Sequence, residues 1–297
     1  MIKEIKVLVK LLGVLLLFIS MPFGIVLAQP FVDDGQVNLF PGGSGQNRST
    51  AFNLYNNYPP TINWYMPAGN RRMVLIGIND TSMTIDLRTH VVNGIHAWAM
   101  ASGVAFNEVA NQSEANIIFN VQDEDDIYSV NGETLARTTP PVNRSSVITF
   151  YRRNWQNLYP HGDFVREVQG YMVRGSNEED AMNFIAARTA MHEIGHALGF
   201  MHPGTHERRD PEGSLNTIVM LESYPTPSPA IMEPSQYGFE ELYTANENRP
   251  IGISNLGISR QERSVLDTLR ADRQATGHIR NLVASLAIGR LFLRRSK

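Results

Sequence analysis

The sequence contains no cysteine, and this absence excludes several classes of protein at once. Disulfide scaffolds, thiol nucleophiles and cysteine-ligated zinc sites all require that side chain. Charged residues make up only 19% of the 297 residues and the formal net charge is -3, so no basic excess favours nucleic acid as a partner. Hydrophobic residues make up 42%, which is typical of a globular protein and too high for a fully disordered chain.

Only one long apolar run is present, and it lies at the N-terminus. A basic start precedes the apolar segment 11–19, and Val26 and Ala28 stand at the positions that a signal peptidase reads. We therefore interpret residues 1–28 as a signal peptide and expect a secreted protein, extracellular or periplasmic. An uncleaved membrane anchor is the alternative, because residues 7–28 nearly reach the length of a membrane span, although a proline and a glycine interrupt them.

The remaining chain divides into a leader, a domain and a tail. Residues 29–58 are polar and rich in turn residues, which predicts a flexible leader or short propeptide. Residues 59–272 hold strand-like segments first and helical segments later, which predicts an α+β fold with a mixed sheet backed by helices. Residues 273–297 mix apolar and basic side chains. They predict an amphipathic tail that packs on the domain or contacts a membrane surface or a partner.

Hydrophobic periodicity predicts the individual elements of the domain. Strands are expected around Ile62 and Trp64 and over 73–78, 106–109, 116–121 and 147–151. Helices are expected over 86–104, 176–198 and 261–273. Ser176 and Glu179 have the spacing of a capping box at the start of the second helix. Beyond Gly199 the chain is rich in turn residues and shows few periodic signals.

The decisive motif, His192-Glu-Ile-Gly-His196, lies near the end of the longest predicted helix. Residues four apart share one helix face, so the two histidines can bind the same metal ion. Gly199 can adopt a left-handed conformation and end the helix, which allows His202 to become a third ligand. Three imidazoles leave a fourth position for water, as is typical of catalytic zinc sites. Glu193 lies close enough to act on that water as a general base.

These residues make the sequence resemble the metzincins, a clan of zinc endopeptidases, and among them most closely the matrixins. His202-Pro-Gly204 is similar to the serralysin form of the third ligand. The resemblance covers about residues 59–272, and its upstream part consists of Gly94–Trp98, Val104–Val109 and Glu114–Phe119. It implies a metzincin-type catalytic domain. Such a domain has a mixed twisted sheet with an antiparallel edge strand, a long zinc-binding active-site helix and a C-terminal helix.

The resemblance also implies a methionine turn beneath the zinc ligands. The segment 228–234 resembles the matrixin form, so we expect Met232 to be that methionine. Met220 is the alternative, since its segment lies closer in sequence to the third ligand. Pro234 and Tyr237 are expected to help form the wall of the substrate pocket.

Two features of the matrixins are not matched. The segment before the zinc motif has no histidine until His161, so no second, structural zinc is expected. Calcium has one candidate site, Asp123-Glu-Asp-Asp126, and a solvated acidic loop is the alternative.

Matrixin latency depends on a propeptide cysteine. Here Asp33 or Asp34 of the leader is the candidate for blocking the zinc, and an inert leader is the alternative.

Taken together, the sequence predicts a secreted, monomeric zinc endopeptidase whose partners are protein or peptide substrates. The substrate is expected to lie extended along the strand at 116–121. The alternative is a non-catalytic zinc-holding adhesion or binding module on the same fold. Glu193 favours the enzyme, because a purely structural zinc site needs no carboxylate at that position.

Overall fold

The structure is a computed structural model that describes most of the chain between residues 54 and 274. The described residues are 38–39, 54–77, 81–123, 134–139, 141, 144–159, 162–202, 205–209, 215–220, 231–232, 235–260, 262–271 and 273–274. The predicted signal peptide, Asp33, Asp34 and the tail beyond 274 lie outside them. The boundaries proposed for leader, domain and tail therefore stay predictions.

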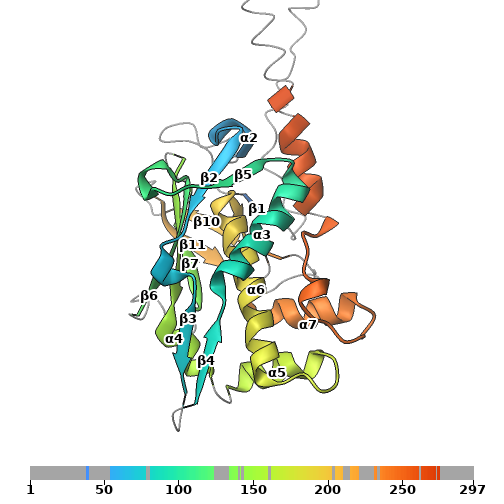
Figure 1. Ribbon diagram of the computed structural model, residues 1–297. Coiled ribbons are helices and arrows are strands. Elements are labelled where there is room, and N and C mark those ends of the chain that lie inside the picture. The colour runs from blue at the N-terminus through green and yellow to red at the C-terminus, as the bar shows by residue number, and fades with distance from the viewer. Residues whose placement is uncertain are drawn as a thin grey trace, which may run out of the picture.

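A five-stranded mixed sheet forms one layer of the domain, and helices cover one of its faces (Figure 1). The strand order is β5-β2-β6-β8-β7, with every neighbouring pair parallel except β7 and β8. The strands are β2 (Thr61–Tyr65), β5 (Ala105–Glu108), β6 (Ile117–Gln122), β7 (Ala136–Thr138) and β8 (Ser146–Tyr151). The predicted mixed sheet with an antiparallel edge strand is therefore present.

One expectation about this sheet is wrong. The strand predicted at 116–121 is β6, and it lies between β2 and β8 rather than at an edge. Its apolar side chains Ile117 and Phe119 are fully buried, as is usual for a central strand. β8 pairs with the whole of β6 and β2 pairs with Ile117 and Ile118, so β6 is not the edge strand along which a substrate was expected to lie. The antiparallel edge is instead β7.

Two helices form the core of the second layer. Helix α3 (Leu87–Ser102) begins at Asp86, whose side chain accepts a hydrogen bond from the Thr89 amide, and ends at the left-handed Gly103. Helix α6 (Glu178–Ala197) crosses the domain beside it (Figure 1). The two backbones approach closely at Gly94, where a Cβ atom would lie 3.2 Å from the Cα atom of Met191.

The start of α6 differs by one residue from the prediction. The capping box is formed by Asn177 and Asp180, not by Ser176 and Glu179. The Asn177 side chain accepts from the Asp180 amide at 2.8 Å, and the Asp180 carboxylate accepts from the Asn177 amide at 2.9 Å. Asparagine caps at least as well as serine, so both registers satisfy the sequence pattern and the spacing alone does not separate them.

The shorter elements complete the domain. They are the hairpin of β3 (Met73–Ile76) and β4 (Ser82–Ile85), the helices α2 (Leu54–Asn57), α4 (Arg152–Leu158) and α5 (Asp163–Tyr171), and the 3-10 turns at Ala68–Asn70, Gln112–Glu114 and Ile253–Asn255. Helix α2 falls within the range assigned to the leader, and its Leu54 and Tyr55 side chains are buried in the core.

The segment after Gly199 contains more regular structure than the sequence predicted. Strand β9 (Phe200–Met201) pairs antiparallel with β1 (Asn38–Leu39), and β10 (Thr205–Arg209) pairs antiparallel with β11 (Leu215–Met220). Helix α7 (Ser235–Ala245) follows. The sequence shows few periodic signals here because these strands are short and β10 is mostly polar, which leaves little alternation to detect.

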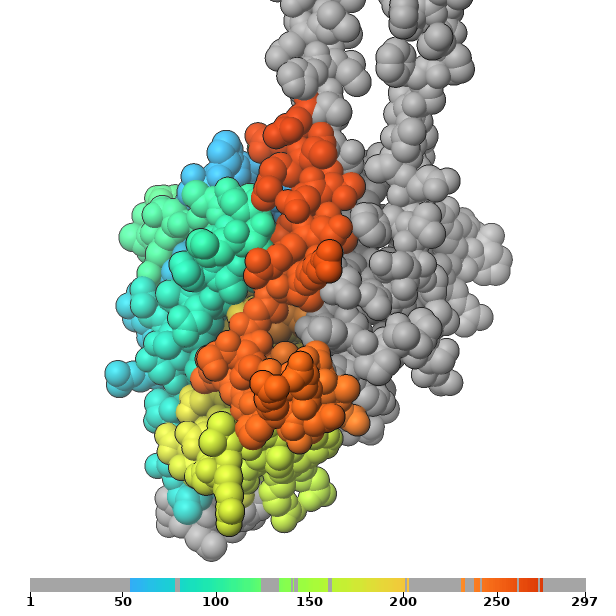
Figure 2. Space-filling model, turned by 90° about the vertical axis from the view of Figure 1, so that its right-hand side faces the viewer, coloured from blue at the N-terminus to red at the C-terminus, as the bar shows by residue number. Residues whose placement is uncertain are grey.

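The predicted final helix is present at residues 262–271 and lies against the end of α3 (Figure 2). Arg270 donates a 2.6 Å hydrogen bond from Nη2 to the Ser102 carbonyl, which also accepts from the Tyr55 hydroxyl at 2.7 Å. The C-terminal helix, α2 and the end of α3 are thereby joined at one carbonyl. Within the described part of the chain, no helix combines the length and the apolar character needed to cross a membrane.

Candidate metal centre and active site

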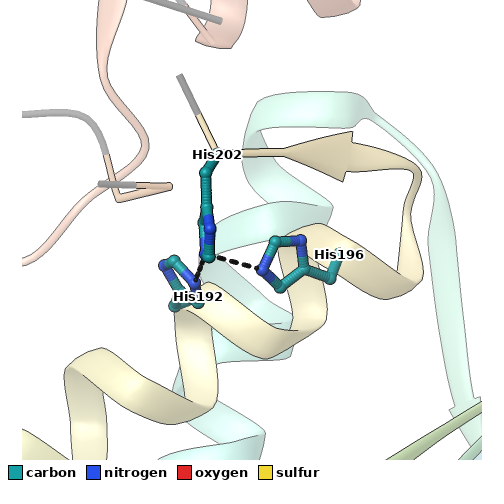
Figure 3. A group of neighbouring side chains, drawn as sticks. All are labelled: His192, His196 and His202. Carbon is teal, nitrogen blue, oxygen red and sulfur yellow. Dashed lines mark hydrogen bonds between the residues drawn. The ribbon is translucent and has the colours of Figure 1, made fainter. Parts of the chain in front are cut away.

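Three histidines converge at the end of α6 (Figure 3). His192 and His196 lie one turn apart on the helix, and the left-handed Gly199 (φ 100°) reverses the chain after it. Strand β9 then brings His202 back over the helix. One ring nitrogen from each histidine lies within 4.8 Å of the others, so the geometry anticipated from the motif spacing is present.

The hydrogen bonds of the rings orient their nitrogens. His192 Nδ1 donates to the Ile231 carbonyl and His196 Nδ1 donates to the Phe200 carbonyl, each at 2.8 Å. A carbonyl can only accept, so both Nδ1 atoms carry hydrogen, and in a neutral ring this leaves the lone pair on Nε2. These Nε2 atoms lie 2.9 and 3.1 Å from Nε2 of His202.

Burial keeps two of the rings neutral. It lowers the pKa of His192 well below its ordinary value, with smaller contributions from neighbouring His196, His202 and Arg188. It also lowers the pKa of His202 to about 3, assisted by His196 and Arg188. Neutral imidazole is the form that binds metal.

The donor set fits zinc. Tetrahedral zinc with Zn–N bonds of about 2.0–2.1 Å separates its nitrogen ligands by about 3.3 Å, close to the spacing found here. His192, His196 and His202 therefore fit one zinc ion, with a position left for water.

The carboxylate of Glu193 lies beside this cluster and is almost fully buried, with 6% of the residue exposed. The Thr138 hydroxyl on the edge strand β7 lies 2.6 Å from Glu193 Oε2 and 3.0 Å from the Glu193 carbonyl. Burial raises the pKa of Glu193, while His196 and the Thr138 hydrogen bond lower it to a smaller extent. The result is a carboxylate of raised proton affinity with one oxygen fixed. Sequence reasoning missed Thr138, because a lone threonine 55 residues upstream carries no local signal.

Met232 lies beneath the helix that carries the first two histidines. It is fully buried, and a Cβ atom on Gly195 would overlap its Sδ atom. The same Cβ would lie 2.8 Å from the Trp98 ring, so only glycine fits at 195. The side chains of the other expected residues are not described: Met220 in β11, Pro234, and Tyr237 in α7.

A buried carboxylate, that of Glu262, accepts a hydrogen bond from the backbone at Met232. Glu262 is completely inaccessible, and its Oε1 atom accepts from the Met232 amide at 3.0 Å. Its Oε2 atom accepts from the Ser259 amide at 2.7 Å. Burial raises the pKa of Glu262, and these hydrogen bonds together with the positive charge of Arg188 oppose that rise. Sequence reasoning missed both Glu262 and Arg188.

Further metal sites have no support in the described residues. Asp123 forms an ion pair with Arg152 at 2.9 Å, and residues 124–126 lie outside the described part, as does His161. The three-histidine cluster is the one group there whose geometry suits a metal ion. Calcium therefore has no support.

Comparisons with known proteins agree with the resemblance. Residues 75–208 match the matrixin family of peptidases, a little less than half of the chain. Serralysin G of Dickeya chrysanthemi is 24% identical over 128 residues, or 43% of this chain. The matched part is only 23% of that relative's length. Among solved structures, a chain of the GM1-bound form of the ECX AB5 holotoxin matches with a TM-score of 0.60 at 20% identity. This match covers 80% of the present chain and 89% of the other, and it shows the shared fold alone.

Proposed function

We propose that this protein is a secreted zinc-dependent endopeptidase, and the similarity of residues 75–208 to the matrixins supports this. One observation carries the proposal. Three imidazoles turn their Nε2 atoms toward one point, and the buried carboxylate of Glu193 lies on the residue next to the first of them. A site that only binds zinc for stability has no use for that carboxylate.

The proposed roles follow from the site. His192, His196 and His202 hold one Zn²⁺, which supplies Lewis acidity that lowers the pKa of a water to about 7 and polarises a carbonyl. Glu193 takes a proton from the attacking water through Oε1, since Oε2 accepts from Thr138. Glu193 then passes this proton to the nitrogen of the leaving amine. Its raised proton affinity suits a group that must hold the proton between these two steps.

We propose that the substrate lies extended along β7. In the described sheet this strand pairs on one side only, with β8, so its outer edge offers backbone groups to a peptide. Thr138 connects this edge directly to Glu193. A peptide paired with β7 therefore runs past the general base.

The tight packing of Met232 against Gly195 supports it as the methionine turn. Pro234 and Tyr237 remain our candidates for the pocket wall that follows this turn.

Export and latency complete the proposal. We propose that residues 1–28 direct export and that the leader restrains activity through Asp33 or Asp34. The pairing of β1 with β9, which directly precedes His202, supports a leader that passes close to the metal centre. Chains with Asp33→Ala and Asp34→Ala are expected to cleave substrate faster than the unaltered leader-containing chain. Equal rates would contradict this route to latency.

The function is tested by incubating the chain from Gln29 with an unfolded protein and detecting new peptide termini by mass spectrometry. Cleavage is expected, and both Glu193→Ala and a zinc chelator should abolish it. Zinc binding without cleavage, persisting after the leader is trimmed toward residue 58, would favour a non-catalytic binding module instead.

A further inference from the structure

One peptide group joins a buried carboxylate to a metal-binding histidine. The carbonyl of the Ile231–Met232 peptide accepts from His192 Nδ1 at 2.8 Å. The N–H of the same peptide donates to Glu262 Oε1 at 3.0 Å. Glu262 lies 30 residues beyond this peptide in the sequence, and the peptide gives its carboxylate a hydrogen-bonded path to the His192 ring.

Glu262 is fixed firmly enough to act in this way. Its second oxygen accepts from the Ser259 amide at 2.7 Å, and the Ser259 hydroxyl accepts from the Glu262 amide at 3.2 Å. This reciprocal pair is a capping box at the start of the C-terminal helix. The cap occupies only one carboxylate oxygen. The other oxygen is directed at the peptide beneath the metal centre and makes no contribution to the cap.

Hydrogen bonds and a neighbouring positive charge favour the ionised form of Glu262, against the burial that raises its pKa. Each carboxylate oxygen accepts from a backbone N–H, and the positive charge of buried Arg188 favours the ionised form further. A charged acceptor on the N–H side polarises a peptide and makes its carbonyl a stronger acceptor. The stronger carbonyl holds the His192 ring with hydrogen on Nδ1, which leaves the Nε2 lone pair available to the metal.

We propose that Glu262 is a positioning residue that raises the zinc affinity of His192 through the Ile231–Met232 peptide. The inference rests on the proposed metal site. It adds that the C-terminal helix is part of that site, because its capping carboxylate determines how firmly the first ligand is oriented. Mutation of the groups that hydrogen-bond a metal ligand commonly changes metal affinity by about 10–100-fold. The Ile231 carbonyl is such a group, and Glu262 acts on it through the same peptide.

The test is Glu262→Gln in the full chain, with zinc affinity measured by competition against a chromophoric chelator. Glutamine has nearly the same shape, but it is neutral and offers one acceptor oxygen to two N–H donors. Zinc affinity is expected to fall by about 10–100-fold. Unchanged affinity in a folded Glu262→Gln chain would overturn the inference.

Ser259→Ala is the matched control. It removes the hydroxyl that accepts from the Glu262 amide and leaves both carboxylate hydrogen bonds in place. We expect a lower midpoint of thermal unfolding with zinc affinity unchanged. Equal losses of zinc affinity in Ser259→Ala and Glu262→Gln would reduce Glu262 to a structural cap and contradict the proposal.

A second measurement needs no variant and covers the case in which Glu262→Gln fails to fold. Zinc bound at Nε2 makes Nδ1–H of His192 a stronger donor, which polarises the peptide and strengthens its bond to Glu262. The Met232 amide proton is therefore expected to move downfield in NMR spectra on zinc addition, whereas the Ser259 amide, on the other carboxylate oxygen, stays in place. A Met232 resonance that stays or moves upfield would contradict the relay. A chain that binds no zinc at all would instead overturn the proposed function.

Discussion

The close packing beneath the metal centre makes Gly195→Ala a sharp perturbation. Gly195 lies on α6 between the two helical histidines, and an added methyl group would overlap Met232 Sδ and lie 2.8 Å from Cζ2 of Trp98. Both neighbours are completely buried. The Trp98 ring is also held by a 2.8 Å hydrogen bond from Nε1 to the Met191 carbonyl, so it cannot move aside freely.

Two opposing terms determine the size of the effect. Alanine is favoured over glycine inside a helix by about 0.8–1.0 kcal/mol. Overpacking of a filled core typically costs about 1–3 kcal/mol. The methionine can shift its flexible side chain but the tryptophan cannot, so we expect the upper half of this range and a net loss of about 1–2 kcal/mol. Zinc affinity should also fall, because the displaced methionine carries the peptide that binds His192.

The assay is urea unfolding of the zinc-free chain, which separates packing from metal binding. Gly170→Ala is the matched control, since Gly170 lies on α5 with nothing within 4 Å of its added Cβ. We expect this control to be unchanged or more stable by up to about 1 kcal/mol. If Gly195→Ala proves as stable as Gly170→Ala, the helix and the methionine are not in the tight contact described here.

Three further outcomes are expected. Thr138→Val should lower kcat by at least about ten-fold with KM unchanged, because the Glu193 carboxylate loses the hydrogen bond from the Thr138 hydroxyl. Thr138→Ser keeps a hydroxyl and should restore kcat. Equal kcat values in wild type and Thr138→Val would contradict a role of Thr138 in catalysis. Tyr58→Phe removes a 2.8 Å hydrogen bond to the Ala197 carbonyl at the end of α6 and should lower the free energy of unfolding in urea by about 1–2 kcal/mol. A Tyr58→Phe chain with wild-type stability would contradict a role of this hydrogen bond in holding the end of α6. Burial lowers the pKa of His90 below its ordinary 6.5, so protonation favours the unfolded chain and stability should fall as the pH drops below 6.5. Relative to His90→Gln, the wild type should lose up to about 1.4 kcal/mol per pH unit in that range, and parallel pH profiles of the two chains would contradict this account.

Much of the fold can be predicted from short segments of the sequence. Strands with alternating burial, such as the one at 73–76, and helices with clear periodicity, such as α3, are formed where the pattern predicts them. The three-histidine cluster follows from helical spacing and one glycine, because all three ligands and the turn lie within eleven residues. Short polar strands such as β10 lack this periodicity, and the sequence analysis did not find them.

Contacts between distant segments could not be derived in this way. Thr138 reaches Glu193 across 55 residues, and Glu262 reaches Met232 across 30. Neither residue belongs to a periodic pattern that marks it as part of a site. The position of β6 in the sheet is a similar case, because strand order depends on pairing partners rather than on the strand's own residues. The signal peptide, the leader and the tail remain predictions.

The most direct test of the central claim compares zinc content and proteolysis in wild type and Glu193→Ala. Both chains are expected to bind one zinc ion, since the carboxylate is not a ligand, and only the wild type should cleave an unfolded protein. A Glu193→Ala chain that retains zinc and cleaves at the wild-type rate would contradict the assignment of Glu193 as the general base of a zinc endopeptidase.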